Sequence, residues 1–352
     1  MHGNDHLAEA LRWSTGTEVE WDQGLSAAAG MAVPVLLAAA AGHISLGLAA
    51  SAGSLVASGV GAGSSAREQA QELASVLAPA ALASLAAVLA SGHGWLSDAI
   101  LVVLACAAAT LGGYSRPAVA AAMRFVLFLV IIIAVADATP NRAGLVLLIA
   151  AGALWTSVVS LLLGVLIRRR RRPAATAASA NPQNATAAQK FARWSRSLKS
   201  LAGWQYTLRL GFCLGIAGLM RSLWPEHHLH WIALTVAILL QRQIDSASVK
   251  STQRTLGTAL GVLAASLFLA FQPPAWGLGL CIGLLAGLRP WLKARNYLAY
   301  SAVMAPLVLL LLDGGGPLHA GVLIDRLLAT LVGAALVAAA NAIMRRVLQT
   351  PA

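Results

Sequence analysis

Three arginines inside or at the mouth of apolar segments are the residues of this chain best suited to chemistry. Arg209 lies about a turn and a half inside one apolar segment, Arg254 opens another, and Arg326 lies about a turn inside the last. A charge within a membrane costs roughly 2.5–3.5 kcal/mol, so such residues are functional candidates by default. The guanidinium group is permanently charged, and its planar fork matches a carboxylate. These arginines therefore predict a site for an organic anion.

A second interpretation gives these arginines no ligand. Arg209 and Arg254 would then extend their charged ends to the polar boundary of the membrane, as long basic side chains do. Arg326 would pair with an acidic group such as the adjacent Asp325. The sequence leaves both interpretations open.

Polar and aromatic residues accompany Arg254. Trp231 and Thr235 share one apolar segment, and a short polar link joins it to the segment that Arg254 opens. Thr258 follows Arg254 by about one helical turn. An indole ring can stack on an aromatic ligand, and a hydroxyl can donate or accept a hydrogen bond. These three residues are therefore predicted to shape the anion site.

Glycines recur every four residues in two of the apolar segments. They are Gly257 and Gly261 in one segment and Gly279, Gly283 and Gly287 in the other. This spacing favours close packing of helix backbones. Approach of a substrate to the bare backbone is the less favoured alternative.

Export driven by a proton gradient would need a titratable group, and the acidic candidates are Asp245 and Asp325. Most histidines fall in or beside predicted outer loops, where imidazole could sense external pH. The run 226–230, Glu-His-His-Leu-His, could even hold a metal ion. We favour polar residues at helix ends as the explanation, and predict no metal site and no cofactor.

No enzymatic constellation stands out in the sequence. The glycine-rich run 59–65 lacks the Gly-Lys-Ser/Thr of a phosphate-binding loop. No nucleophile beside a base and no paired carboxylates are visible, and catalysis usually needs such groups. The three cysteines lie within apolar runs, where they behave as small hydrophobic residues. The chain is therefore not predicted to be an enzyme.

Composition indicates an integral membrane protein. Of the 352 residues, 58% are hydrophobic and only 11% are charged, against about 25% charged in soluble domains. The net charge of +12 could suggest nucleic acid, but most charges lie in loops between apolar runs. We therefore expect a lipid bilayer as the surrounding medium and no nucleic acid partner.

Twelve apolar runs predict about twelve transmembrane helices in an all-α fold. Many of them reach the roughly 20 residues that cross a bilayer. In the first half the runs end near residues 41, 60, 90, 113, 137 and 167; in the second half they cover about 204–223, 229–241, 254–271, 275–289, 297–312 and 321–344. The eighth and tenth runs look short for a full crossing.

The predicted organisation is two parallel six-helix repeats. It comprises an N-terminal tail (1–22), a first membrane repeat (23–167), a basic linker (168–200), a second repeat (201–346) and a C-terminal tail (347–352). Arg116-Pro117 is matched with Arg289-Pro290, and Arg67 with Arg254. Parallel repeats relate by an axis along the membrane normal, and transport sites often lie between them.

Charge placement predicts that both termini are cytoplasmic. In that orientation most lysines and arginines lie at cytoplasmic ends or loops, which is the positive-inside pattern. The exceptions are Arg142, Arg209, Arg221 and Arg326. The basic linker, 168–199, could bind anionic lipid, although a signal for orientation is the favoured reading.

The second half resembles the fusaric acid resistance-like (FUSC) family, also called the aromatic acid exporter family. The resemblance rests on Arg209, on Trp231 with Thr235, on the run Arg254-Thr-Leu-Gly-Thr-Ala-Leu-Gly261, and on the run Arg326-Leu-Leu-Ala-Thr-Leu-Val-Gly333. It covers 201–346 well and 23–167 only in rhythm, since no Gly-Thr follows Arg67. The resemblance implies a plasma-membrane exporter of aromatic or other organic acids, distantly similar to plant malate channels, and a homodimer.

Together these observations favour a multi-pass transporter of a bacterial inner membrane that exports organic anions, with aromatic carboxylates as one candidate class. Its predicted substrate contacts are Arg209, Trp231, Thr235, Arg254, Thr258 and Arg326. An organic-anion channel is the alternative, because it needs the same basic lining. A membrane protein of the cell envelope without transport activity is the third possibility.

Overall fold

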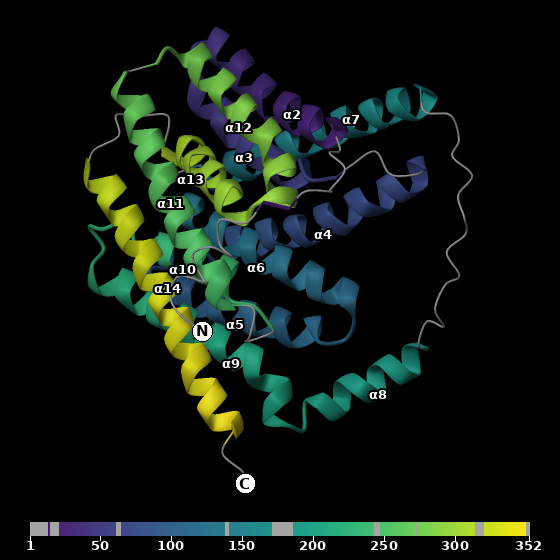
Figure 1. Ribbon diagram of the computed structural model, residues 1–352, viewed down its shortest axis with the longest axis vertical. Coiled ribbons are helices and arrows are strands. Elements are labelled where there is room, and N and C mark those ends of the chain that lie inside the picture. Colours follow the sequence, from purple (N-terminus) through teal and green to yellow (C-terminus); the bar gives the residue numbers. More distant parts are fainter. Residues whose placement is uncertain are drawn as a thin grey trace.

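The computed structural model describes residues 13–14, 21–60, 65–137, 141–170, 186–242, 247–271, 273–313 and 320–349, and these form an all-helical bundle (Figure 1). The first group of helices is α2 (Trp21–Ala40), α3 (Ile44–Ala57), α4 (Ala66–Ala90), α5 (Trp95–Gly112), α6 (Arg116–Asp137) and α7 (Arg142–Arg170). After α8 (Ala187–Ser197), the second group is α9 (Leu201–Leu223), α10 (His230–Leu239), α11 (Ala247–Ala270), α12 (Ala275–Arg295), α13 (Tyr297–Asp313) and α14 (Ala320–Gln349).

Seven of the described helices are long and apolar enough to cross a membrane: α2, α4, α5, α6, α7, α12 and α14. Shorter apolar helices accompany them, among them α3 and the ten-residue α10. Large side chains such as Leu89, Leu219 and Leu267 are exposed on the surface of the bundle. An exposed apolar surface of this kind suits lipid rather than water. The chain is a multi-pass membrane protein, as its composition predicts.

The prediction of a short tenth span is wrong. Helix α12 does not stop before Pro290 but continues to Arg295. A proline inside a helix removes one backbone hydrogen bond, and neighbouring helices in a membrane bundle can compensate for it. Pro117 instead lies in the first turn of α6, where a proline costs little. The two Arg-Pro pairs therefore do not occupy equivalent places, and their matching is also wrong.

The two groups of helices use the same pairings. In the first group α2 packs on α3 and α7, α3 on α7, α4 on α6 and α7, and α5 on α6. In the second group α9 packs on α10 and α14, α10 on α14, α11 on α13 and α14, and α12 on α13. Each of these pairings has its counterpart in the other group, in the same chain order, whereas the contact of α4 with α5 has no counterpart of similar extent between α11 and α12.

Helices of one group also pack directly on helices of the other group. Helix α2 packs on α12 and α5 packs on α9, while α3 meets α13 and α6 meets α10. Figure 1 shows α2 and α12 side by side at the top of the bundle. Helices from both groups therefore surround the centre of the bundle, and any cavity there has walls from both halves of the chain.

Glycines let these helices approach closely, which confirms the packing interpretation of their spacing. A Cβ built at Gly283 of α12 would lie 2.8 Å from the Cβ of Ala32 in α2. One built at Gly257 of α11 would lie 2.5 Å from the carbonyl oxygen of Leu298 in α13. Neither position leaves room for a methyl group, so the glycines of both segments are used for helix contacts.

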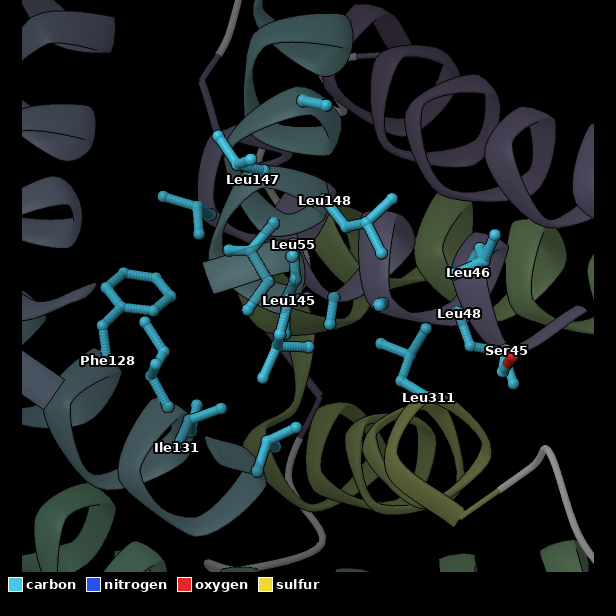
Figure 2. A pocket seen from close by; sticks show the side chains of 18 of the residues that line it. Ser45, Leu46, Leu48, Leu55, Phe128, Ile131, Leu145, Leu147, Leu148 and Leu311 are labelled. Atoms are coloured by element: carbon cyan, nitrogen blue, oxygen red, sulfur yellow. The ribbon is translucent and has the colours of Figure 1, made fainter. Parts of the chain in front are cut away.

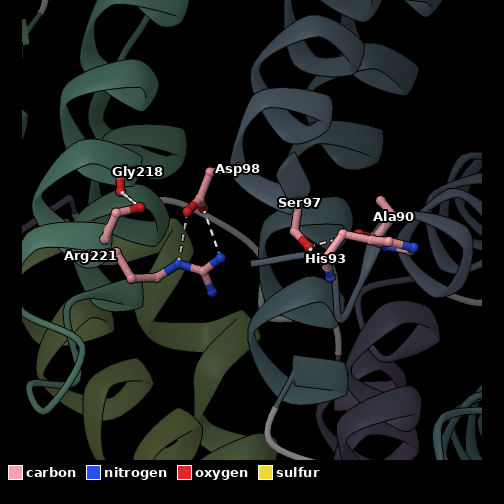
Figure 3. Close-up of polar contacts among 7 residues, drawn as sticks. Ala90, His93, Ser97, Asp98, Gly218 and Arg221 are labelled. Carbon is pink, nitrogen blue, oxygen red and sulfur yellow. Dashed lines mark hydrogen bonds and ion pairs between the residues drawn. The ribbon is translucent and has the colours of Figure 1, made fainter. Parts of the chain in front are cut away.

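An ion pair joins α5 and α9 (Figure 3). The Arg221 guanidinium contacts both carboxylate oxygens of Asp98, at 3.0 and 3.1 Å. Such a fork-to-fork arrangement is the strongest geometry for this pair. It gives a local partner to one of the arginines that departs from the positive-inside pattern. In the same figure, Ser97 donates to the carbonyl of Ala90 and holds the turn between α4 and α5.

Helix α8 lies at the edge of the bundle in Figure 1. The indole N–H of Trp194 donates to the carbonyl oxygen of Thr110 at the end of α5, at 3.0 Å. Phe191 is exposed on the same helix, and Arg193 and Arg196 lie on the face away from it, while Lys190 lies one turn before Trp194. An amphipathic helix with basic residues opposite aromatic ones is typical of a membrane surface.

The tightest helix crossing gives a prediction of stability. A Cβ at Gly152 of α7 would lie 1.7 Å from the carbonyl oxygen of Ala50 in α3. Gly152→Ala should therefore lower the free energy of unfolding by roughly 1–3 kcal/mol, because the backbones must separate. The control is Gly215→Ala in α9, where a Cβ meets nothing within 4 Å. Thermal unfolding in detergent measures both, and equal melting temperatures would contradict the close crossing.

Candidate functional site

A cavity of about 620 Å³ lies between the two groups of helices. Its walls come from α2, α3, α4 and α6 of the first group and from α10, α11, α12 and α13 of the second. Gln23, Glu72 and Arg254 come from the early turns of α2, α4 and α11, and Lys293 from the last turn of α12. The cavity therefore lies at the end of the bundle where these three helices begin. We call it the basic cavity.

Charge in the basic cavity is strongly positive. Arg124, Arg254, Arg289 and Lys293 line it, and Glu72 is the one carboxylate beside them among the described residues. Glu72 and Lys293 are exposed, whereas Arg254 is 5% and Arg289 is 8% exposed. Two buried cations with low-dielectric walls around them attract an anion far more strongly than cations in open water would.

Arg254 is positioned by the packing of α11 against α13. Gly257 and Gly261 lie about one and two turns after Arg254 and contact Leu298 and Ala302 of α13. Their spacing from Arg254 places all three on one stripe of the helix, which faces the protein interior. With the residues that the structure describes, the Arg254 guanidinium forms no hydrogen bond or ion pair. Its donors are thus available to a ligand in the cavity.

Arg289 belongs to the buried stripe of α12 that also contains Ile282, Gly283 and Ala286. Its Nη2 donates to the hydroxyl of Ser58 at the end of α3, at 2.6 Å. This hydrogen bond crosses between the two groups of helices. Arg289 therefore has one fixed partner and retains other donors of its guanidinium fork.

Aromatic rings accompany these cations. Phe128, Trp291 and Tyr300 line the basic cavity together with aliphatic side chains. The guanidinium of Arg295 packs over the Trp291 ring, with its Cζ 4.7 Å from the ring centroid. A few convergent charges within apolar and aromatic walls are typical of a small-molecule site.

Arg209 has a different set of partners. Its guanidinium donates to the carbonyl oxygens of Gln241 and Arg242, at 3.1 and 3.2 Å, and to the side-chain oxygen of Asn341. Its Nε donates to the carbonyl of Gln205. Four of its five N–H donors are thus engaged. Arg209 therefore binds the chain just after α10, where the two acceptor carbonyls lie beyond the last residue of the helix.

Arg326 stacks on Trp231. Its Cζ lies 3.5 Å from the ring centroid, and both residues are almost fully buried. A desolvated cation over an indole face is worth about 2 kcal/mol. Thr235 donates to the carbonyl of Trp231 and packs on Gly333 of α14. These contacts join α10 to α14, whereas α10 faces the basic cavity through Leu234 and Ile238.

The remaining predicted residues are spread over the bundle. Asp325 accepts hydrogen bonds from His227 and His228, at 3.0 and 3.2 Å, where α14 begins. Thr258 is buried one turn beyond Arg254, and its hydroxyl has no hydrogen-bond partner among the described residues. Asp245 lies outside the described residues.

Of the six predicted substrate contacts, only Arg254 lines the basic cavity. Sequence reasoning did not select Arg124, Arg289 or Tyr300. A signal for Arg289 existed, because it follows Ile282 by seven and Ala286 by three residues, the spacing of one face of a helix. Arg67, which the sequence pairs with Arg254, is exposed at the start of α4. Within the described residues, no three His, Cys, Asp or Glu side chains gather to hold a metal ion.

A comparison with protein-family models finds one match. Residues 212–340, which run from α9 into α14, match the family described as fusaric acid resistance protein-like. The match contains Arg254, Arg289 and Arg326, and it confirms the resemblance seen in the sequence. Searches of curated proteins and of solved structures give no match. The family and the apolar helices together indicate a membrane transport protein.

The contacts of Arg209 give a prediction. Arg209→Ala should lower the free energy of unfolding by about 2–4 kcal/mol, because each acceptor left without its donor costs roughly 1–3 kcal/mol. Denaturation of the purified protein in detergent measures the change. Arg67→Ala, which removes an exposed arginine, should leave stability unchanged. Normal stability of Arg209→Ala combined with lost anion binding would instead make Arg209 a ligand contact.

Proposed function

We propose that this protein exports organic anions across a bacterial inner membrane through the basic cavity. The observation that carries the proposal is the pair of buried arginines, Arg254 and Arg289, in a cavity walled by both groups of helices. Because an arginine fork matches a carboxylate, the two residues would select organic acids. The family match of residues 212–340 agrees with a transport role.

The proposal includes a twelve-helix architecture of two parallel repeats. Helices α2–α7 and α9–α14 would be the repeats, since most of their internal pairings correspond. The contacts between the groups correspond as well: α2 with α12 matches α9 with α5, and α3 with α13 matches α10 with α6. A site between repeats is what an alternating-access transporter needs, because rocking of one repeat against the other opens it to either side. The basic cavity, which has walls from both groups of helices, would be that site.

Substrate contacts would be divided among the arginines. Arg254 would bind the carboxylate directly, and Arg289 would bind it while holding Ser58. Arg209 and Arg326 would act by positioning α10, with Trp231, Thr235 and Thr258 forming the packed support on α10 and α11. The rings of Phe128, Trp291 and Tyr300 would accommodate an aromatic acid.

Proton coupling would use Asp325 together with His227 and His228. The carboxylate accepts from both imidazoles and from the backbone N–H of His228. Its neighbour in sequence, Arg326, stacks on Trp231 of α10. Protonation of Asp325 would therefore change the electrostatic environment of a contact that joins α14 to α10. Asp245 remains the second candidate for this role.

An anion channel is the alternative, since the same arginines would line its pore. A channel conducts without alternating access, so it would pass current at single-channel level. Helix α8 would lie on the cytoplasmic surface in either case, with its basic face near anionic lipid headgroups.

Efflux from proteoliposomes tests the proposed site. Wild-type protein should release labelled benzoate and other carboxylates, faster with a pH gradient. Arg254→Ala should slow efflux about ten- to hundredfold, because a hydrogen bond to a charged group contributes roughly 1.5–3 kcal/mol. Arg67→Ala, a matched loss of charge outside the cavity, should transport normally.

Other outcomes of the flux experiment separate the alternatives. Wild-type efflux by Arg254→Ala would rule out Arg254 as the substrate contact. Voltage-sensitive flux of many anions without dependence on a pH gradient would favour the channel. No flux of any acid would favour a protein of the envelope without transport activity.

Orientation gives a separate prediction. A reporter fused after Arg172, which lies outside the described residues, should be cytoplasmic, because the adjacent arginine run belongs on the cytoplasmic side. A reporter after Gln349, at the end of α14, should be on the same side. Activity of a periplasmic reporter at either position would contradict the topology.

A further inference from the structure

A second cavity, of about 730 Å³, lies among α3, α6, α7 and α13. Figure 2 shows its walls, where Leu55, Phe128, Ile131, Leu145 and Leu148 come together from different helices. Ser45 and Asn141 are the only polar side chains that line it among the described residues. We call it the apolar cavity. Its size is within the range of sites that hold small molecules, roughly 300–1,000 Å³.

The two cavities share a wall. Leu55, Val56, Phe128, Ile131 and Val308 line both the basic and the apolar cavity. These side chains come from α3, α6 and α13, so both groups of helices contribute to the boundary. No charged residue lines the apolar cavity within the described chain, whereas four cations line the basic one.

We propose that the two cavities form one composite site for an amphiphilic anion, a carboxylate with an extended saturated chain. Arg254 and Arg289 hold the carboxylate in the basic cavity, and the chain passes the five shared side chains into the apolar cavity. The inference rests on the proposed anion transport and adds the class of substrate.

The physical reason for this assignment is the division of polarity. A charged group cannot enter the apolar cavity without losing its solvation, because nothing there can pair with it. A saturated chain, however, gains by leaving water for an aliphatic surface. A ligand with one charged end and one apolar end satisfies both cavities at once, and the shared wall gives it a path between them.

The shared wall also sets the position of the chain. Phe128 lies on α6 beside the basic cavity and faces the apolar cavity in Figure 2. Val308 lines both cavities from α13, and α13 packs on α11, the helix that carries Arg254. A chain that displaces these side chains would therefore contact helices on both sides of the interface between groups.

The test measures equilibrium binding of straight-chain carboxylates to the purified protein in detergent, by calorimetry. From butanoate to octanoate, affinity should rise about fourfold for each added CH₂, since its burial contributes roughly 0.8 kcal/mol. Ala52→Phe places a ring in the apolar cavity, which Ala52 lines without touching the basic one. In this variant octanoate should bind no better than butanoate, and butanoate should bind as in wild type.

Two further variants keep the test decisive. Leu148→Phe fills the same cavity from α7 and serves where Ala52→Phe does not fold. Leu154→Phe adds bulk on the outer surface of α7, where Leu154 is 65% exposed, and should keep the full dependence on chain length. A dependence on chain length that survives both cavity-filling variants would overturn the composite site.

Octanol distinguishes a lipid occupant from the proposed anion. If octanol binds as tightly as octanoate and loses affinity equally in Ala52→Phe, the apolar cavity holds a lipid chain independently of the arginines, and the composite site is wrong. If octanoate binds as proposed but does not move across the proteoliposome membrane, the composite site stands and the transport function fails. Weak octanol binding together with tight octanoate binding supports the proposal.

Discussion

The structure depends on one constraint, which is that an arginine buried among apolar helices must be given a partner. Water is absent from a bilayer interior, and an unpaired charge there costs several kcal/mol. Arg221 meets Asp98, Arg209 meets two carbonyls and Asn341, Arg326 stacks on Trp231, and Arg289 meets Ser58. Arg254 forms no such contact with the described residues and opens into a cavity. Four of these five arginines therefore have partners within the described protein, whereas Arg254 has none there.

The interlocking of helices explains why that cavity exists. Glycine-lined crossings bring α2 against α12 and α11 against α13 without space between them. Where α3, α6, α10 and α13 meet across the two groups, larger side chains such as Leu55, Phe128 and Met304 are present. The basic cavity occupies this region.

Much of the fold could be predicted from the sequence, because an apolar run of about 20 residues has few alternatives to a membrane helix. The end of α12 could not be predicted in this way. Pro290 is a local signal for the end of a helix, and only the surrounding helices allow α12 to continue to Arg295. Arg254 has a local signal, a charge opening an apolar segment.

The partners of Arg209 carry no such local signal. They are carbonyls that follow α10 and a side chain of α14, both distant in sequence. Likewise, Arg124 lines the basic cavity while it donates to Ser75 of α4, a helix on which α6 packs. Contacts between segments far apart in the chain depend on packing, which periodicity and charge placement do not encode.

The most direct test of this account locates a bound anion. Crystals of the protein soaked with 4-bromobenzoate would give an anomalous signal at the bromine, and density would place the carboxylate. The account predicts the carboxylate within hydrogen-bond distance of Arg254, in the cavity between the two groups of helices. A carboxylate bound beside Arg209 or Arg326, with the basic cavity holding only water, would contradict it.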